Sequence, residues 1–380
     1  MGISNLQSNP PAADEIEVSL IGPNIGECVV VHVGDNRWII VDSCLDDQSG
    51  RPAALAYLEA LNVSPQSVVL VVATHWHDDH IRGLVQILEA CDNASFCASP
   101  LMNELEFMSA ICAYNKEPLT ASGSGVQELY RATEYLARLG RPIVRALESR
   151  MIRRWGDGQP MQSEIWTLSP SDEGFNRFIA SAKRITPTAK QTQHRAPLIL
   201  PNDTSVVLQV VIGQVSVLLG ADLEESGDAR FGWSAILGSQ GKPAIKSQVF
   251  KVPHHGSSNG HHPDVWSKML SPDPIAVLAP YSRSPRLPQN SDIDRIVALA
   301  PKSFSSSIVA SKRAKISRAP DVERILQDFG LNLQKINLTP GVVQARFAPG
   351  RSAEWSVELF NGALPLTSLK QLSGRRNQGA

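Results

Sequence analysis

Apolar and polar positions along the chain change between two periods, one typical of buried strands and one typical of helices. Residues 67–73 form a short apolar run rich in valine, of the kind that a strand buried on both faces shows. From 81 to 90 the apolar residues recur at helical spacing and place Leu84, Ile87 and Leu88 on one face. A buried strand followed by a helix is therefore predicted. The loop between them is where α/β enzymes tend to place their chemistry.

Similar runs on both sides of this strand predict two groups of strands with helices between them. The turn Gly34-Asp35-Asn36 indicates a hairpin, because these residues tolerate the left-handed backbone that tight turns need. The predicted strands cover residues 15–20, 27–33, 37–41, 67–73, 94–99, 163–168, 205–211, 215–219, 247–252, 274–278, 341–347 and 355–360. The predicted helices cover residues 52–61, 81–90, 103–114, 126–139, 173–183, 292–299 and 322–329.

The ends of the chain and one internal segment differ in composition from the rest. Residues 1–14 are polar with two prolines and predict a disordered lead, and the polar residues 369–380 predict a mobile tail. The stretch from about 101 to 160 breaks the strand pattern and predicts a helical insertion packed over the main domain. Residues 15–368 are then expected to form one domain, including this insertion.

The loop after the valine-rich strand carries the residues best suited to chemistry. It reads Thr74-His-Trp-His-Asp-Asp-His80, so three of the nine histidines fall within six residues. His75 and His77 are two apart, so on extended backbone they point the same way and can chelate one ion. Asp79 and His80 follow on the turn and can face a second ion. Imidazole and carboxylate ligands together favour a divalent metal, zinc foremost and manganese as the alternative.

Further candidates stand at the ends of other predicted strands. Asp222 follows Gly220-Ala221 at the end of a strand, where it can bridge two metals or simply cap the next helix. His254 and His255 follow the strand at 247–252, with the small residues Gly256-Ser-Ser beside them. Asp42 ends the strand at 37–41 and could also serve only as a turn cap.

Composition narrows the class of protein. The net charge of −1 excludes a broadly basic nucleic-acid coat, and an apolar fraction of 42% is enough for a sizeable core. Five cysteines without paired spacing fit reduced thiols in the cytoplasm. The first residues lack the pattern of a secretion signal, and the sequence has no apolar stretch of the roughly 18 residues that a membrane span needs. A soluble, cytoplasmic chain that contacts no membrane is expected.

Together these motifs resemble the metallo-β-lactamase superfamily. The segments Asn202-Asp-Thr-Ser205, Gly220-Ala-Asp222 and Lys251-Val-Pro-His-His-Gly-Ser257 look most like its competence-type branch, which includes the hydrolase domain of bacterial DNA-uptake channel proteins. The resemblance covers about 15–100 and 160–300. It implies an α/β fold in the form of a four-layer αββα sandwich, with the helical insertion added. No channel segments exist in this sequence, so an uptake role does not carry over.

The resemblance also implies roles for individual residues. His75 and His77 hold a first metal, Asp79 and His80 hold a second, and Asp222 bridges them. One histidine of the next motif completes the second metal; we favour His254, with His255 as a supporting or substrate-contacting residue. Asp42 supports the metal loop from behind. The superfamily pattern has a histidine about 20 residues before the bridging aspartate, but here Asn202 stands in its place and leaves the first metal one ligand short, unless His194 supplies it.

The function expected from these residues is metal-dependent hydrolysis. A metal-bound hydroxide would attack an ester centre, and Asp79 would orient it or accept its proton. A phosphodiester of a nucleic acid or nucleotide ranks first as substrate, because Arg283 and Arg286 lie on a loop near the predicted cleft and a guanidinium matches phosphate oxygens. A small ester, thioester or lactam is the alternative. Asn202 also leaves open a regulatory or binding subunit with a weakened metal site.

Overall fold

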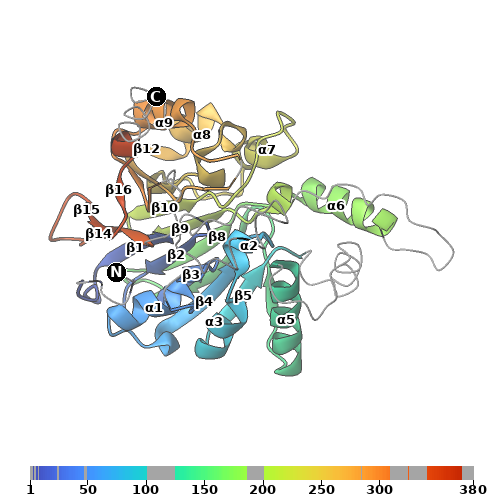
Figure 1. The fold of residues 1–380 in the computed structure, drawn as a ribbon, viewed down its shortest axis with the longest axis horizontal. Coiled ribbons are helices and arrows are strands. Elements are labelled where there is room, and N and C mark those ends of the chain that lie inside the picture. Colours follow the sequence, from blue (N-terminus) through green and yellow to red (C-terminus); the bar gives the residue numbers. More distant parts are fainter. Residues whose placement is uncertain are drawn as a thin grey trace.

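The computed structural model describes residues 3, 6, 8–23, 25–46, 49–100, 125–185, 201–283, 285–308, 324 and 340–369. Within these ranges the chain forms two eight-stranded sheets that face each other, with helices on both outer sides (Figure 1). This arrangement confirms the predicted αββα sandwich. The predicted helix at 103–114, most of the predicted helix at 322–329, His194 and the tail beyond Leu369 lie outside the described residues.

The first sheet has the strand order β15-β14-β1-β2-β3-β4-β5-β6. Strands β3, β4, β5 and β6 run parallel to one another, and the remaining neighbours are antiparallel. The predicted hairpin joins β2 to β3, with positive φ at Asp35 and Asn36. The strands are β1 (Ile16–Gly22), β2 (Cys28–His32), β3 (Trp38–Val41), β4 (Val68–Ala73), β5 (Ser95–Ala98), β6 (Ile143–Arg145), β14 (Gly341–Phe347) and β15 (Ser356–Phe360).

The second sheet has the order β16-β13-β12-β11-β10-β9-β8-β7. Here β10, β11, β12 and β13 are the parallel neighbours. The strands are β7 (Arg150–Trp155), β8 (Ser163–Thr167), β9 (Leu208–Ile212), β10 (Val215–Leu219), β11 (Ser247–Lys251), β12 (Leu270–Leu278), β13 (Ser303–Ser305) and β16 (Leu364–Pro365).

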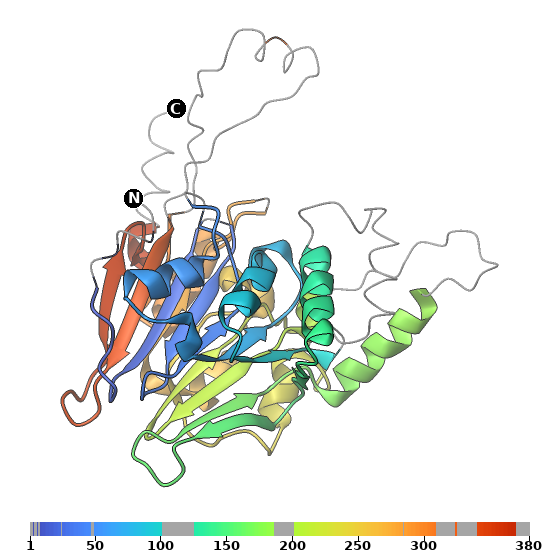
Figure 2. The same cartoon turned by 90° about the horizontal axis from the view of Figure 1, so that it is seen from below.

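Helices cover the outer face of each sheet (Figures 1 and 2). The first sheet packs against α1 (Ala53–Ala60), α3 (Leu84–Ala90) and α5 (Gly125–Arg138), and the second packs against α7 (Gly232–Gly238), α8 (Pro263–Lys268) and α9 (Asn290–Leu299). The short α2 (Asp78–Ile81) lies at the end of β4, and α6 (Asp172–Ile185) follows β8. None of the helices in the described ranges combines the length and hydrophobicity that a bilayer crossing requires.

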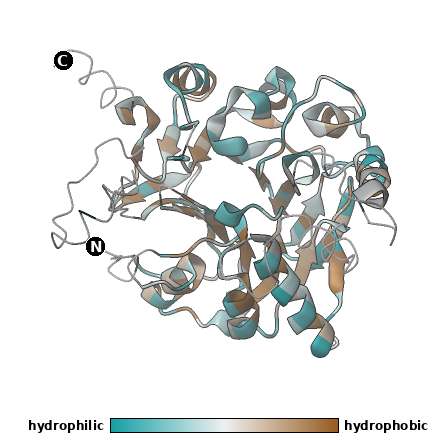
Figure 3. Cartoon of the chain, turned by 45° about the vertical axis from the view of Figure 1, so that its right-hand side comes forward, coloured by the Kyte–Doolittle hydropathy of each residue, from teal (hydrophilic) through white to brown (hydrophobic). Residues whose placement is uncertain are grey.

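Three apolar clusters hold these four layers together. The central cluster lies between the sheets and includes Val31 and Val72 from the first sheet and Val210 and Val249 from the second. The other two clusters lie under the helices on the outer faces. The sheets therefore bury both faces, which explains why their strands read as near-continuous apolar runs. In Figure 3 brown gathers on the strands, whereas the helices carry teal stretches.

The predicted insertion and the predicted lead both contain structure that the sequence pattern did not indicate. Within the predicted insertion at about 101–160, α5 is helical, but β6 and β7 are strands that extend the two sheets. β7 carries arginines because it lies at the edge of its sheet, where charged side chains reach solvent. In the lead at 1–14, Ile3 and Leu6 are buried in the cluster under α1 because both are apolar and meet its surface.

Candidate metal centre

The parallel strands of both sheets end at the same edge of the sandwich, and the predicted site residues follow those ends. β3 leads to Asp42, β4 leads to the His75–His80 loop, β10 leads to Asp222 and β11 leads to His255. Pairing of Asp42 N with Val72 O at 2.8 Å and of His254 N with Ala221 O at 3.1 Å continues the two sheets beyond the strands. The fold therefore brings residues from four separate segments to one place.

The His75–His80 loop bends so that its imidazoles gather. His75 Nε2 lies 3.1 Å from His77 Nδ1, which agrees with two side chains that share one ion. The rings of His75 and His80 are 4.2 Å apart between centroids. His75 and His80 are fully buried, whereas His77 is half-buried and closer to solvent. The start of α2 at Asp78 turns the chain between His77 and His80.

Asp222 lies at the centre of the second group. Its Oδ2 is 3.3 Å from His80 Nε2 and 3.4 Å from His255 Nε2. Asp79 Oδ2 is 3.2 Å from His255 Nε2 and 3.8 Å from His80 Nε2. The Nε2 atoms of both histidines therefore point at the same two carboxylates. This is the arrangement that a cation between these four side chains would require.

His255, and not His254, joins this group. The Nδ1 of His255 is hydrogen-bonded to Ala279 O at 3.0 Å, which leaves Nε2 facing Asp222. His254 turns away, with Nδ1 2.8 Å from Asn259 Oδ1 and its side chain 18% exposed. The sequence preference for His254 is therefore not matched by the geometry. Both residues have positive φ, and this tight turn reverses the side that each imidazole faces.

Asn202 lies beside His254 and not among the buried imidazoles of the centre. Its Nδ2 donates to Glu224 Oε1 at 2.8 Å and is 3.4 Å from His254 Nε2. The buried Oδ1 of Asn202 has no hydrogen-bond partner. The position that a histidine takes in the family pattern therefore holds an amide whose nitrogen is already engaged.

Asp42 lies behind the loop and contacts both Thr74 and His80. Its Oδ2 accepts from Thr74 Oγ1 at 2.7 Å and pairs with His80 Nδ1 at 2.8 Å, and its Oδ1 accepts from Thr74 N at 2.8 Å. Thr74 Oγ1 is in turn 3.0 Å from His75 Nδ1. When His75 donates its Nδ1–H to Thr74 Oγ1 and His80 donates its Nδ1–H to Asp42, the Nε2 lone pair of each ring faces the centre.

Two buried charged residues beside the centre were missed by sequence reasoning. Glu27 and Lys251 are 2% and 1% exposed, and they form an ion pair next to Asp222. Glu27 was read as an ordinary residue at the start of an apolar strand, and Lys251 was noted only as the first residue of the motif at 251–257, without a role of its own. The signal that could have revealed them is a charged residue within an otherwise apolar run, because such residues are rarely buried without a partner.

The charges of the centre shift the pKa values of its residues in opposite directions. Burial lowers the pKa of His75 and His77. Burial also acts to lower the pKa of His255, but the carboxylates of Asp222, Asp79 and Glu27 together outweigh it and the pKa rises to about 10. His80 is raised in the same way, well above the ordinary imidazole pKa, by Asp222 and Asp79. The carboxylates therefore create a strongly negative environment that attracts positive charge.

The side chains present fit a divalent cation. The ligand atoms of Asp79, His80 and His255 lie within 4.8 Å of one another, as do those of Asp42, His75 and His80. His80 Nε2 at the centre is buried without a hydrogen-bond partner, whereas Asp222 Oδ1, which also lacks one, lies 3.6 Å from Lys251 Nζ. Buried polar atoms normally have partners, so the bare His80 Nε2 indicates a ligand. Mixed imidazole and carboxylate donors suit zinc and similar divalent metals.

The loop at 281–287 covers one side of the centre. Tyr281 stacks on the ring of His255, with centroids 5.2 Å apart and an angle of 25° between the planes. Tyr281 N and O are both paired with Leu287, which closes the loop. Arg283 and Arg286 are exposed on it. The loop therefore carries two guanidinium groups on a segment whose base touches a candidate ligand.

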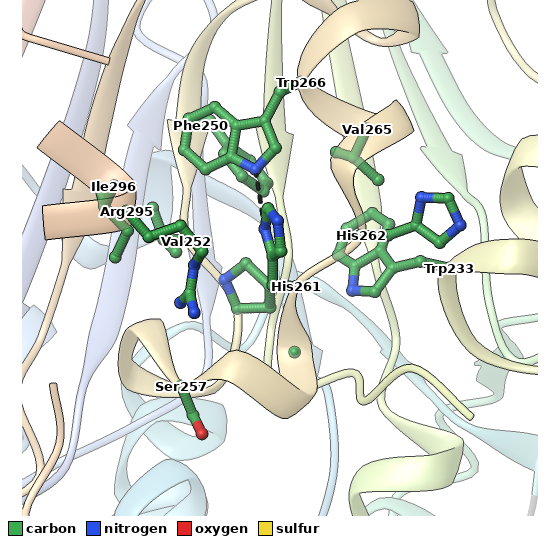
Figure 4. A pocket seen from close by; sticks show the side chains of 12 residues that line it. Trp233, Phe250, Val252, Ser257, His261, His262, Val265, Trp266, Arg295 and Ile296 are labelled. Atoms are coloured by element: carbon green, nitrogen blue, oxygen red, sulfur yellow. Dashed lines mark hydrogen bonds between the residues drawn. The ribbon is translucent and has the colours of Figure 1, made fainter. Parts of the chain in front are cut away.

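A separate pocket lies on the other side of the His254–Gly260 turn (Figure 4). Arg295 Nη2 donates to Gly256 O at 2.6 Å and holds this turn against α9. Trp266 Nε1 donates to His261 Nδ1 at 3.2 Å. The lining combines aromatic side chains, among them Trp233, Phe250 and Trp266, with aliphatic and polar ones. His261 and His262 thus belong to the support of the turn and not to the centre.

Comparison with known proteins gives a family for part of the chain. Residues 21–144 match the model of the metallo-beta-lactamase superfamily. A search of curated protein sequences finds no match.

Solved structures with a similar fold include three metallo-beta-lactamases. The MIM-2 enzyme has a TM-score of 0.27 and 14% identity, over 54% of this chain and 57% of its own. The Rm3 enzyme has a TM-score of 0.32 and 12% identity, over 70% of this chain and 85% of its own. An enzyme from Cronobacter sakazakii has a TM-score of 0.31 and 14% identity, over 61% and 73%. The match thus spans little more than half the length of the first of these proteins.

Proposed function

We propose that this chain, whose residues 21–144 match the model of the metallo-beta-lactamase superfamily, is a metal-dependent phosphodiesterase or nuclease. The observation that carries the proposal is the convergence of Asp79, His80, Asp222 and His255, with two imidazole Nε2 atoms and two carboxylate oxygens facing one another. These residues come from both sheets. A chance polar cluster would not leave the buried His80 Nε2 without a partner.

The residues divide naturally between two cations. His75 and His77 would hold the first; Asp79, His80 and His255 would hold the second; and Asp222 would lie between them. Zinc is the first candidate and manganese the alternative, because imidazoles and carboxylates are mixed. A divalent cation bound there would polarise an ester oxygen and lower the pKa of a water to about 7.

The chain's own residues orient the reaction. Asp42 and Thr74 hold the tautomers of His80 and His75, and Ala279 O does the same for His255. Asp79 has a carboxylate at the rim of the centre, 12% exposed, where it can accept a proton from an attacking water. Tyr281 covers His255 and limits solvent on that side.

A phosphodiester is favoured as substrate by the loop at 281–287. Arg283 and Arg286 are exposed on this loop, which begins at Tyr281 on the ring of His255. Guanidinium groups bind phosphate oxygens in a bidentate way, whereas an uncharged ester would make no comparable use of them. A nucleic acid or nucleotide therefore fits the surroundings of the centre better than a small neutral ester does.

Asn202 favours a second candidate, a binding or regulatory subunit with a weakened first metal site. Asn202 stands where the family pattern has a histidine, and its amide nitrogen is held by Glu224. In that case the centre would hold fewer cations and hydrolyse slowly or not at all.

The cysteines support a cytoplasmic location. Cys28, Cys44, Cys91 and Cys97 are all buried and free of disulfides, and burial raises the pKa of Cys91 and Cys97 to about 12. Such thiols are unreactive and suit a reducing compartment.

Metal analysis of the purified protein and turnover of two chromogenic esters test the proposal. We expect at least one metal per chain and hydrolysis of bis-p-nitrophenyl phosphate in preference to a p-nitrophenyl carboxyl ester. His77→Ala and Asp222→Asn should each abolish turnover without unfolding the protein. Asp264→Asn is a matched control, because Asp264 pairs only with Lys268 at an exposed position. Activity on neither ester, with less than one metal per chain, would favour the binding subunit.

A further inference from the structure

The buried ion pair of Glu27 and Lys251 is unusual for its position. Glu27 directly precedes β2 in the first sheet, and Lys251 ends β11 in the second. Both side chains are 2% exposed, so each charge is removed from water. Removing an ion from water costs several kcal/mol, and a buried ion pair is often no more stabilising than apolar side chains of the same size. Stability alone therefore does not account for this pair.

Lys251 contacts the segment that carries Asp222. Its Nζ donates to Ala221 O at 2.8 Å and lies 3.6 Å from Asp222 Oδ1. Ala221 has a φ of 47°, a conformation that residues other than glycine rarely adopt, so its carbonyl direction must be held by partners. With Lys251 beside Oδ1, the other oxygen of Asp222 faces the imidazoles of His80 and His255.

Glu27 contacts the opposite side of the same imidazoles. Its Oε1 lies 3.7 Å from His80 Nδ1, and its Oε2 lies 3.8 Å from His255 Nδ1. These Nδ1 atoms are already paired with Asp42 and Ala279 O, so Glu27 faces the back of the rings and not their free Nε2 atoms. Its backbone N also donates to Asp79 O at 2.9 Å.

The approach of this segment to the metal loop is close. A Cβ built at Gly26 would lie 3.0 Å from Asp79 O and 2.8 Å from Cys44 Cβ, and Gly26 has a φ of 98°. Only glycine fits there. Glu27 is thus fixed against the loop by its backbone, and its side chain reaches past the loop to Lys251.

We infer that Glu27 and Lys251 are positioning residues for the second cation. Lys251 fixes the direction of Asp222, and Glu27 holds the rear of His80, His255 and the Asp79 backbone, so that the four ligands are arranged before a cation arrives. This inference rests on the proposed function, because it requires that the centre binds a metal.

Geometry and simple electrostatics make different predictions for the pair. Replacing both residues by neutral ones of the same shape leaves the net charge near the centre unchanged. If the pair acted only through charge, the affinity for cations would therefore stay the same. If it acts by orienting ligands, the affinity falls. Lys251→Met combined with Glu27→Gln makes this replacement, since both new side chains keep about the same length and no unpaired charge remains.

The test measures binding of Mn²⁺ alone by calorimetric titration, and the visible spectrum of the Co²⁺-loaded protein, which reports the coordination of the ion. We expect the double variant to fold, to bind the tighter of two Mn²⁺ ions, or the only one, at least tenfold less tightly, and to show an altered Co²⁺ spectrum. Supporting interactions behind metal ligands commonly have effects of 10–100-fold. The control replaces the exposed pair Lys302–Asp273, joined at 2.9 Å, by Met and Asn.

The outcomes separate the inference from the proposed function. If the unmodified protein binds no metal, the proposed function fails. If it binds metal and the double variant binds it equally well with the same Co²⁺ spectrum, the positioning role is refuted. A double variant that does not fold, by circular dichroism, assigns the pair a purely structural role and also overturns the inference.

Discussion

Asp42→Asn tests how the hydrogen bonds of the Asp42 carboxylate support the metal loop. The substitution keeps the shape of the side chain, and so the packing around it, and changes only the carboxylate to an amide. Asp42 accepts three hydrogen bonds, from Thr74 N, Thr74 Oγ1 and His80 Nδ1, at 2.7–2.8 Å. An amide can accept at only one of its two ends. If the NH₂ faces His80, that ring must move its proton to Nε2 and loses the lone pair directed at the centre. If the amide flips, its NH₂ faces the backbone N–H of Thr74, and two donors cannot form a hydrogen bond.

In both orientations one buried donor loses its acceptor. Hydrogen bonds to a charged group contribute about 1.5–3 kcal/mol, so the free energy of unfolding should fall by about that amount. Disturbing a group behind a metal-bound histidine typically weakens metal binding about 10–100-fold, and we expect Asp42→Asn to do the same here. Urea unfolding of the protein without added metal measures the first effect, and competition for Zn²⁺ with a chromogenic chelator measures the second.

Glu17→Gln is the matched control. Glu17 is a buried carboxylate that accepts from Tyr57 Oη at 2.6 Å and from Ser19 Oγ at 3.0 Å and pairs with Arg346, away from the imidazoles of the centre. In this control variant the free energy of unfolding should fall, whereas the affinity for Zn²⁺ should stay unchanged. If Asp42→Asn also kept its zinc affinity and lost only stability, Asp42 would serve merely to anchor Thr74, and the argument from the tautomer of His80 would be wrong.

Three further predictions follow from the site and the core. His255→Ala should weaken metal binding more than tenfold whereas His254→Ala should not, as measured by the same chelator competition; equal effects would contradict the placement of these rings. Zn²⁺ at a hundredfold excess over its dissociation constant should raise the free energy of unfolding by about 2.7 kcal/mol, and EDTA should abolish the gain in a thermal melt. Burial lowers the pKa of His32 from 6.5 to about 4, so the stability that its neutral form provides is complete above pH 6.5 and is lost as the pH falls towards 4, by about 3 kcal/mol. His32→Asn, which can still donate to Glu15 O, should remove most of this loss in urea titrations at pH 7 and pH 4.5, and an unchanged pH dependence would exclude His32 as its source.

The alternation of strands and helices and the cluster of histidines and aspartates could be predicted from the sequence because both depend on local patterns. Valine-rich runs specify strands that are buried on both faces, and such a cluster at the end of a run has few purely structural explanations. The four-layer sandwich and the supporting role of Asp42 were expected only from the family resemblance, since the local pattern at Asp42 also left a turn cap open. The structure places Asp42 within 2.8 Å of His80 Nδ1.

Other features depend on contacts that no local pattern reveals. The choice between His254 and His255 is decided by a turn in which both have positive φ, and by Ala279 O, which is far away in the sequence. The pairing of Glu27 with Lys251 joins one sheet to the other. β6 and β7 were missed because short strands at a sheet edge show weak alternation and carry charge.

The centre takes residues from Glu27 in the first sheet to Ala279 at the end of β12 in the second. During synthesis the His75–His80 loop emerges long before β10, β11 and the strand that follows them. Contacts between residues so distant in the chain form late, because the intervening loops must close first. A nascent chain that displays only β1 to β6 would hold the three imidazoles of the loop and the Asp79 carboxylate without Asp222 or His255, and the centre would therefore stay incomplete until β10 and β11 have docked.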